Sequence, residues 1–305
     1  MRSLLLKASG NPWLAKQARQ RGFVRKAVRR FMPGETLDEA LAAAHRLAGE
    51  GIPVVLTQLG ENVDSAAAVT RVVDHYRSAV DRSLAEGLDV QISVKPTHLG
   101  LDLGEEVCRG ALGRLARHAL SAGVPLWIDM EDSSYVERTL ELYLSLLDPG
   151  APLGICLQAY LHRTPEDLDR VLQAGGSVRL VKGAYREPAE VALQGSGAVD
   201  AAFLHLARRL SDETGGDAGG TVGLRHVLGS HDMDLLSQVP DGPEIQMLYG
   251  IRTRVWPSIL AAGTSFRVLI SYGEQWYPWY LRRLAERPAN LIFVARSMLP
   301  GGQGG

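Results

Sequence analysis

The chain has 305 residues, of which 46% are hydrophobic and 22% are charged, and its formal net charge is −1. This composition is typical of a globular protein with one large core, and the near-zero charge argues against nucleic acid as a partner. No apolar run reaches the roughly 18 residues that a membrane-spanning helix needs. Cys108 and Cys156 form neither a CxxC motif nor a disulfide framework, so we expect a reducing, cytoplasmic compartment.

Residues 1–49 are predicted to form an N-terminal helical extension. Thr36 or Asp38 can cap a helix that runs over residues 38–47. The first thirty residues are basic, with Arg2, Lys7, Lys16, Arg19, Arg21, Arg25, Lys26, Arg29 and Arg30. A solvated helical surface is the favoured interpretation of these charges, and peripheral contact with an anionic membrane surface is the alternative.

From residue 50 to residue 300, short apolar stretches alternate with helical patterns. Strands are expected at residues 52–59, 90–94, 124–128, 153–161, 178–181, 222–228, 244–249 and 266–270. Thr164 and Pro165 form a capping and first-turn pair for the helix after the fourth strand. Continuous apolar strands are typical of a parallel sheet that is buried on both faces. Eight strand–helix units predict an α/β fold of the (βα)8 TIM-type barrel class, because an open doubly wound sheet would need a glycine-rich turn that is missing.

The segment VRLVKGAY, residues 178–185, is the most informative strand end. Arg179 and Lys182 place two cations at the carboxyl end of a strand, where a barrel of this class carries its active site. Gly183 and Ala184 allow a ligand to approach the backbone closely. Lys95 also follows a strand, and it and Lys182 are the only lysines beyond residue 26. Lysine offers a compact charge with a tunable pKa, which arginine does not.

Other predicted strands end in polar residues too. They include Glu61, Asp129, Gln158, Ser230 and His231, and the last helix carries Arg282 and Arg283. Together they indicate a ligand with several polar edges and an anionic part, since paired arginines suit a carboxylate. The alternative is a solvated helix face on which Arg282 pairs with Glu286. His231 has no second histidine at a metal-ligand spacing, so no metal site is expected. Asp129 can act as a general base or can hold a neighbouring side chain by hydrogen bonds.

Seven short segments, taken in order, resemble the proline dehydrogenase family, which are flavin enzymes on a distorted (βα)8 barrel. They are VKPTHLGLD (94–102), IDMED (128–132), LQAYL (157–161), VRLVKGAYREP (178–188), GSHD (229–232), MLYGI (247–251) and YLRRLAERPAN (280–290). The resemblance implies FAD-dependent oxidation of L-proline to Δ1-pyrroline-5-carboxylate by hydride transfer to flavin N5, the first step of proline catabolism. It also implies a single-activity enzyme that passes electrons to a quinone at the inner face of the membrane, with pyrroline-5-carboxylate dehydrogenase as a partner.

The resemblance also implies roles for individual residues. Asp129 and Arg179 are implied as the catalytic residues, with Arg179 near flavin N5 and Asp129 fixing Lys95. The substrate would contact Lys95, Arg282, Arg283, Tyr185, Leu248 and Leu269, under a lid that carries Glu61. FAD would contact Met130, Gln158, Arg179, Lys182, Gly183, Ala184, Ser230 and His231.

One position departs from the family pattern. The family usually has a tyrosine in the last strand, packed against proline, where the segment RVLISYG (267–273) places Leu269. We therefore expect weaker discrimination against a substituted ring such as hydroxyproline. Two other functions stay open on the residues alone. One is a Schiff-base lyase that uses Lys95 or Lys182 as its amine, and the other is a barrel without catalytic activity that serves as an interaction module.

Overall fold

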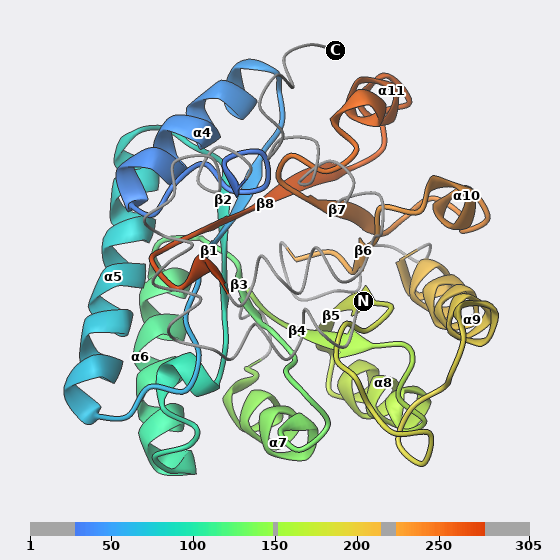
Figure 1. Cartoon of the computed structure of the whole chain (residues 1–305), viewed down its shortest axis with the longest axis horizontal. Helices are drawn as coiled ribbons and strands as arrows, with labels where there is room; N and C mark the ends of the chain where they lie inside the picture. The colour runs from blue at the N-terminus through green and yellow to red at the C-terminus, as the bar shows by residue number, and fades with distance from the viewer. Residues whose placement is uncertain (1–27, 149–151, 215–223, 278–305) are drawn as a thin grey trace, which may run out of the picture.

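A closed barrel of eight parallel strands forms the centre of the molecule (Figure 1). The computed structural model describes residues 28–148, 152–214 and 224–277. The strands, paired in chain order, are β1 (Val54–Gln58), β2 (Val90–Val94), β3 (Leu126–Ile128), β4 (Leu153–Gln158), β5 (Ser177–Val181), β6 (Val227–Gly229), β7 (Glu244–Leu248) and β8 (Phe266–Tyr272). Strand β8 pairs with β1 and closes the barrel, which confirms the predicted fold class.

Helices surround the barrel in the view of Figure 1. The α-helices are α4 (Leu37–Gly49), α5 (Ala66–Ala85), α6 (Glu105–Ser121), α7 (Val136–Leu146), α8 (Thr164–Gln173), α9 (Ser196–Thr214), α10 (Met233–Leu236) and α11 (Trp256–Ala261), with 3-10 turns η1 (Thr97–Leu99) and η2 (Thr253–Val255). Helix α4 packs on β8 and β1. The division into an extension over residues 1–49 and a barrel over residues 50–300 stays a prediction. Within the described ranges, no helix is both long and apolar enough to span a bilayer.

The two faces of β5 bury different kinds of side chain. On β5, Val178 and Leu180 are fully buried and belong to the large apolar cluster that also includes residues of the helices. Arg179 lies between them and points the other way, because successive strand residues face opposite sides. Its guanidinium reaches residues of β2 and β7 across the barrel. The interior is therefore partly polar, whereas the layer between strands and helices is apolar.

Two local predictions at helix starts have different outcomes. Thr36 caps α4, since its hydroxyl accepts from the Glu39 amide while the Glu39 carboxylate accepts from the Thr36 amide. Thr164 is not a cap, because Arg163 holds that position and Thr164 is already helical. The hydroxyl of Thr164 is buried and donates to the carbonyl oxygen of Gln158 at the end of β4, 2.5 Å away. The buried Thr164 hydroxyl thus finds its partner in a strand-end carbonyl and not in the first turn of its own helix.

Strand β6 is shorter than the predicted range 222–228, and begins only at Val227. Side chains replace the backbone ladder just before it. The Ser177 hydroxyl donates to the Leu224 carbonyl at 2.9 Å, and the Val178 amide donates to His226 Nδ1 at 3.2 Å. These contacts give the Ser177 hydroxyl and the Val178 amide, at the start of β5, their hydrogen-bond partners without strand pairing. The apolar pattern of the sequence does not reveal this arrangement.

The buried His226 should make folding stability sensitive to mild acid. Burial lowers the pKa of His226 to about 4. The unfolded chain binds this proton near its ordinary pKa of about 6.5, so the free energy of unfolding should fall by up to about 1.4 kcal/mol per pH unit between those values. His226→Asn keeps an acceptor for the Val178 amide and removes the titration. In urea unfolding, the stability difference between wild type and His226→Asn should shrink as the pH falls through that window.

The exposed His205 on α9 provides the control. His205→Asn should leave the pH slope of stability unchanged, because its side chain lies in solvent in the folded protein as well. A His226→Asn difference that stays constant with pH would contradict the assignment of His226 as a buried neutral side chain.

Candidate active site

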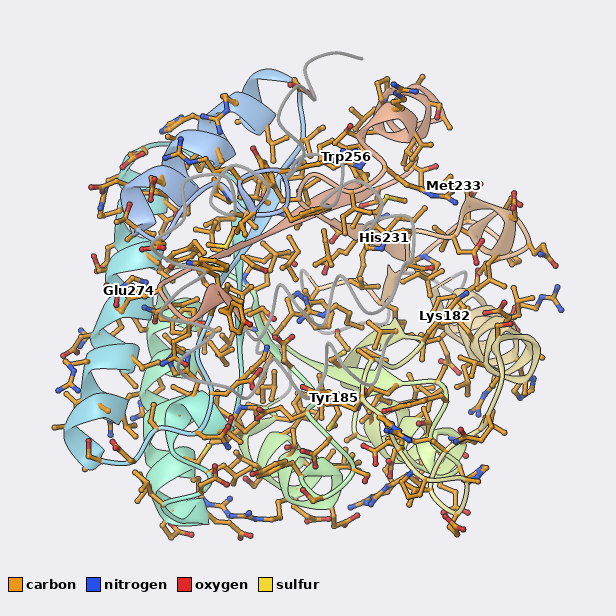
Figure 2. The ribbon with its side chains drawn as sticks, in the orientation of Figure 1. Lys182, Tyr185, His231, Met233, Trp256 and Glu274 are labelled. Carbon is orange, nitrogen blue, oxygen red and sulfur yellow. The ribbon has the colours of Figure 1, made fainter. Side chains whose placement is uncertain are left out.

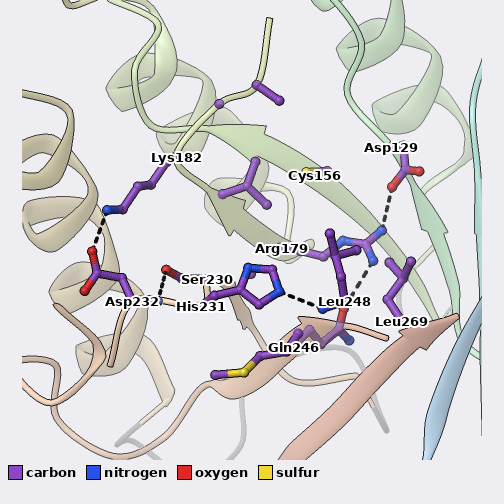
Figure 3. A pocket seen from close by; sticks show the side chains of 15 residues that line it. Asp129, Cys156, Arg179, Lys182, Ser230, His231, Asp232, Gln246, Leu248 and Leu269 are labelled. Carbon is purple, nitrogen blue, oxygen red and sulfur yellow. Dashed lines mark hydrogen bonds and ion pairs between the residues drawn. The ribbon is translucent and has the colours of Figure 1, made fainter. Parts of the chain in front are cut away.

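A cavity of about 370 Å³ opens among the carboxyl ends of the strands (Figure 3). Its size falls within the range of small-molecule sites, roughly 300–1,000 Å³. Nine of the residues that the sequence analysis selected line it: Asp129, Arg179, Lys182, Gly183, Ala184, Ser230, His231, Leu248 and Leu269. In Figure 2, Lys182, Tyr185 and His231 lie inside the ring of helices. The structure thus brings together side chains that are far apart in the chain, from Asp129 to Leu269.

Five other selected residues do not line this cavity. Met130 belongs to the apolar core, and the amide of Gln158 donates to the carbonyl oxygen of Glu131 at 2.8 Å. Lys95 donates a hydrogen bond to Asp129, which does line the cavity. Glu61 and Tyr185 are partly buried. Charge interactions link both Glu61 and Tyr185 to Lys95, so the three belong to one neighbourhood.

Arg282 and Arg283 lie outside the described residues, as do residues 1–27 and the part of the last predicted helix from residue 278 onwards. Their predicted roles stay predictions.

Asp129 joins two cations at the edge of the cavity. Its Oδ1 accepts from Arg179 Nη2 at 2.8 Å and from the Ser93 hydroxyl at 2.8 Å, and its Oδ2 accepts from Lys95 Nζ at 3.3 Å. The Arg179 side chain is 4% exposed, and those of Lys95 and Asp129 are 18% and 19% exposed. The guanidinium carbon of Arg179 also lies 5.0 Å from the centre of the Trp127 ring. One carboxylate therefore fixes a deeply buried cation and a second, slightly more exposed cation.

The charge states of this cluster follow from its geometry. Burial alone would raise the pKa of Asp129, but Lys95, Arg179 and the Ser93 hydroxyl outweigh it, and the pKa lies below the ordinary value. Burial alone would lower the pKa of Lys95, yet Asp129 outweighs it and holds that pKa well above the usual range. A carboxylate with a lowered pKa is a poor general base. Of the two roles left open for Asp129, the structure therefore favours that of holding its neighbours.

Lys182 occupies the far side of the cavity. Its Nζ lies 2.5 Å from Asp200 Oδ1 on α9 and 3.0 Å from Asp232 Oδ2 at the start of α10. Burial lowers the pKa of Lys182, but the two carboxylates outweigh it and raise the pKa overall. Schiff-base chemistry needs a neutral amine. Because Lys95 and Lys182 are both held as ammonium ions, the lyase alternative loses its nucleophiles.

The ring of His231 is fixed by the backbone of β7. The amide of Leu248 donates to His231 Nε2 at 2.9 Å. A ring nitrogen that accepts carries no hydrogen, so in the neutral ring Nδ1 carries it. No group of three or more His, Cys, Asp or Glu side chains in the described parts of the chain is arranged to hold a metal ion.

Gly183 is required by its neighbours. Its φ is +115°, a conformation that residues with a Cβ rarely adopt. A Cβ at this position would also lie 2.2 Å from Cδ1 of Tyr160. The tight contact is thus with a side chain of this chain, a reason for the glycine that the sequence analysis did not include.

Several residues around the cavity were missed by the sequence analysis. Cys156 and Gln246 line the cavity, and Ser93 and Asp200 hold its charged groups. Strand alternation offered a signal, since Ser93 lies two positions before Lys95 and Gln246 two before Leu248. Asp200 had no such signal, because its helix meets Lys182 only in the folded barrel.

Comparisons with known proteins agree on one family. The family model for proline dehydrogenase matches residues 40–296. The chain is 33% identical over 309 residues to proline dehydrogenase 1 of Bacillus subtilis (strain 168), covering 98% of this chain and 99% of that protein. It is 31% identical over 315 residues to proline dehydrogenase of Deinococcus radiodurans, covering 98% of each.

A solved structure is similar in fold. Proline utilization A (PutA) from Bdellovibrio bacteriovorus, inactivated by N-propargylglycine, matches with a TM-score of 0.75 and 24% identity. The match covers 86% of this chain and 33% of that one, so the chain spans about a third of the length of that protein.

Replacing Asp129 should destabilise the protein in a pH-dependent way. Asp129→Asn leaves Lys95 and Arg179 without their shared counter-charge, and we expect a loss of about 3 kcal/mol at neutral pH, as for a broken buried ion pair. Because the folded pKa of Asp129 is lowered, this contribution is present above the unfolded pKa of about 3.9 and is lost as the pH falls below it. Urea unfolding of both proteins across this range measures the difference.

Asp74→Asn is the matched control, since Asp74 is 62% exposed and lies 3.9 Å from Arg77 on the surface of α5. Its effect should stay within about 0.5 kcal/mol at every pH. Equal losses for the two variants would show that Asp129 does not hold the cations in solution.

Proposed function

Because this chain belongs to the proline dehydrogenase family, we propose that it binds FAD in the cavity and oxidises L-proline to Δ1-pyrroline-5-carboxylate. The chain is an oxidoreductase that acts on proline, in proline catabolism. The observation that supports the finer proposal best is Arg179, a buried cation at the cavity whose position is fixed from three sides by Ser93, Asp129 and Gln246.

The cavity suits a flavin in its chemistry. An isoalloxazine is flat, with an apolar end and a polar end, and it gains negative charge on reduction. The cavity offers apolar contacts from Val181, Leu248 and Leu269 and a cation from Arg179. A bound flavin would supply the acceptor for the hydride. Arg179 would lie on its N5 side and stabilise the reduced form electrostatically.

Further residues would hold the cofactor. We propose that Lys182, Gly183, Ala184, Ser230 and His231 contact it from the cavity, and that Met130 and Gln158 contact it from β3 and β4. For Gln158 this contact can use its oxygen or its second N–H, because one N–H donates to the Glu131 carbonyl.

The substrate would be held by its carboxylate. Lys95 would bind it together with Arg282 and Arg283, while Asp129 keeps the ammonium of Lys95 in place. Clustered cations also favour the neutral amine of proline, since a further positive charge nearby is penalised. Loss of a hydride from C5 and of a proton from nitrogen then gives the C=N bond of the product. The contribution of this chain is orientation of the ring, which is worth several kcal/mol in comparable reactions.

The surroundings of the substrate complete the proposal. Tyr185, Leu248 and Leu269 would pack beside the proline ring, and Glu61 would close a lid by pairing with an arginine of the last helix. The electrons would pass to a membrane quinone, and the basic segment before residue 31 would make peripheral contact with the membrane. The product would pass to pyrroline-5-carboxylate dehydrogenase.

An absorbance spectrum of the purified protein under anaerobic conditions tests the proposal. We expect a flavin band that bleaches when L-proline is added and does not bleach with D-proline, because the carboxylate clamp and the hydride acceptor fix one face of the ring. A protein that shows no flavin band even after incubation with FAD would overturn the proposal. A flavin band that L-proline leaves unchanged would refute the substrate assignment alone.

Leu269 should set the choice between proline and ring-substituted analogues. Leu269 lines the cavity from β8 and is smaller than the tyrosine usual in the family. We expect Leu269→Tyr to raise the ratio of kcat/KM for proline to that for hydroxyproline by about tenfold, the effect of roughly 1.4 kcal/mol in a substrate pocket. Steady-state kinetics with both substrates measure it, with flavin content as the control. An unchanged ratio would mean that Leu269 does not contact the ring.

A further inference from the structure

Two buried amides lie beneath Arg179 in the barrel interior. Gln91 belongs to β2 and Gln246 to β7, and they are 6% and 4% exposed. Gln246 also borders the cavity, whereas Gln91 does not. The two are joined by a hydrogen bond of 3.2 Å from Gln246 Nε2 to Gln91 Oε1.

The orientation of the Gln246 amide follows from its partners. Its Nε2 lies 2.7 Å from Glu244 Oε1, and an ionised carboxylate can only accept. Nε2 must therefore face Glu244, which leaves Oε1 to accept from Arg179 Nη1 at 3.1 Å. A flipped amide would place its nitrogen against the Arg179 donor and its oxygen against the oxygens of Glu244 and Gln91. Glu244 thus determines that Gln246 offers an oxygen to Arg179.

Gln91 supports Arg179 by two routes without touching it. Its Oε1 accepts from Trp127 Nε1 at 2.7 Å as well as from Gln246. The indole nitrogen of Trp127 is a donor only, so this bond fixes the rotation of the ring. The guanidinium of Arg179 lies over that ring. One oxygen of Gln91 therefore orients both the ring and the amide that hold Arg179 from below.

The base of this arrangement is a buried ion pair. Arg267 Nε donates to Glu244 Oε2 at 3.3 Å, and Arg267 Nη1 donates to Asp89 Oδ1 at 2.9 Å. The side chains of Arg267 and Glu244 are 9% and 8% exposed. Arg267 therefore holds the Glu244 carboxylate in place. Glu244 in turn fixes the orientation of the Gln246 amide, which accepts from Arg179.

We infer that Gln91 and Gln246 are positioning residues that hold the Arg179 guanidinium at the cavity, and so help to set the reduction potential of the bound flavin. This inference rests on the proposed function. Asp129 and Ser93 hold Arg179 through Nη2, whereas Gln246 accepts from its Nη1. Without the two amides the guanidinium can rotate about the Asp129 contact, and its charge no longer stays beside the flavin ring.

Anaerobic titration of the FAD-bound protein against a redox dye tests the inference. Gln246→Met and Gln91→Met keep the volume of the side chain and remove its hydrogen bonds. Each should lower the equilibrium constant for flavin reduction, and a tenfold fall corresponds to about 30 mV for a two-electron couple. The double variant should shift no further than the larger single shift, because both residues act through one guanidinium.

Ser177→Ala is the matched control. Ser177 is buried on the same strand as Arg179 and donates to the Leu224 carbonyl, outside the Gln91–Gln246 pair. The variant loses one buried hydrogen bond and should lower thermal stability without changing the potential. If the amides act in folding alone, all the variants should lose thermal stability and keep the wild-type potential, which would contradict the inference.

The outcomes separate the inference from the proposed function. Wild-type protein that binds no flavin overturns the proposed function. Wild-type protein with a proline-reducible flavin, together with Gln91→Met and Gln246→Met at the wild-type potential, overturns the inference alone. If Gln246→Met fails to retain flavin, Gln91→Met decides the question, because Gln91 does not line the cavity.

Discussion

The site depends on one carboxylate that neutralises two buried cations. Removing a charged side chain from water costs several kcal/mol, and the cost is recovered only when the opposite charge is close and the remaining polar atoms are paired. Asp129 meets this condition for Arg179 and Lys95 together, with Ser93 completing its contacts. Because the carboxylate lies between them, the cation proposed to meet the cofactor and the one proposed to meet the substrate are fixed relative to each other.

The same requirement shapes the barrel interior below the cavity. Positive and negative side chains alternate along it, from Asp89 through Arg267 and Glu244 to Arg179, Asp129 and Lys95, with Gln246 between Glu244 and Arg179. A buried polar network is stable only when each member is satisfied. The interior of this barrel therefore serves as a rigid support for the site.

Much of the fold followed from the sequence, and the reasons are physical. A strand buried on both faces must be apolar on at least its helix-facing side, so β5 was evident from Val178 and Leu180. Polar residues at strand ends were also evident, and Asp129, Arg179 and Lys182 do meet at one cavity. Interior residues such as Ser93 and Gln246 were missed because they lie inside their strands, whereas the prediction used the polar residues at the strand ends. Partners brought together only by folding, such as Asp200 beside Lys182, left no pattern in the sequence.

The most direct test of the shared-carboxylate account is a pair of double-mutant cycles on the free energy of unfolding. One joins Asp129→Asn with Lys95→Met, and the other joins Asp129→Asn with Arg179→Met. The account predicts a coupling energy of about 1 kcal/mol or more in both cycles, because each cation loses the same partner. Additive effects in both cycles would show that Asp129 does not hold the two cations together, and would contradict the account.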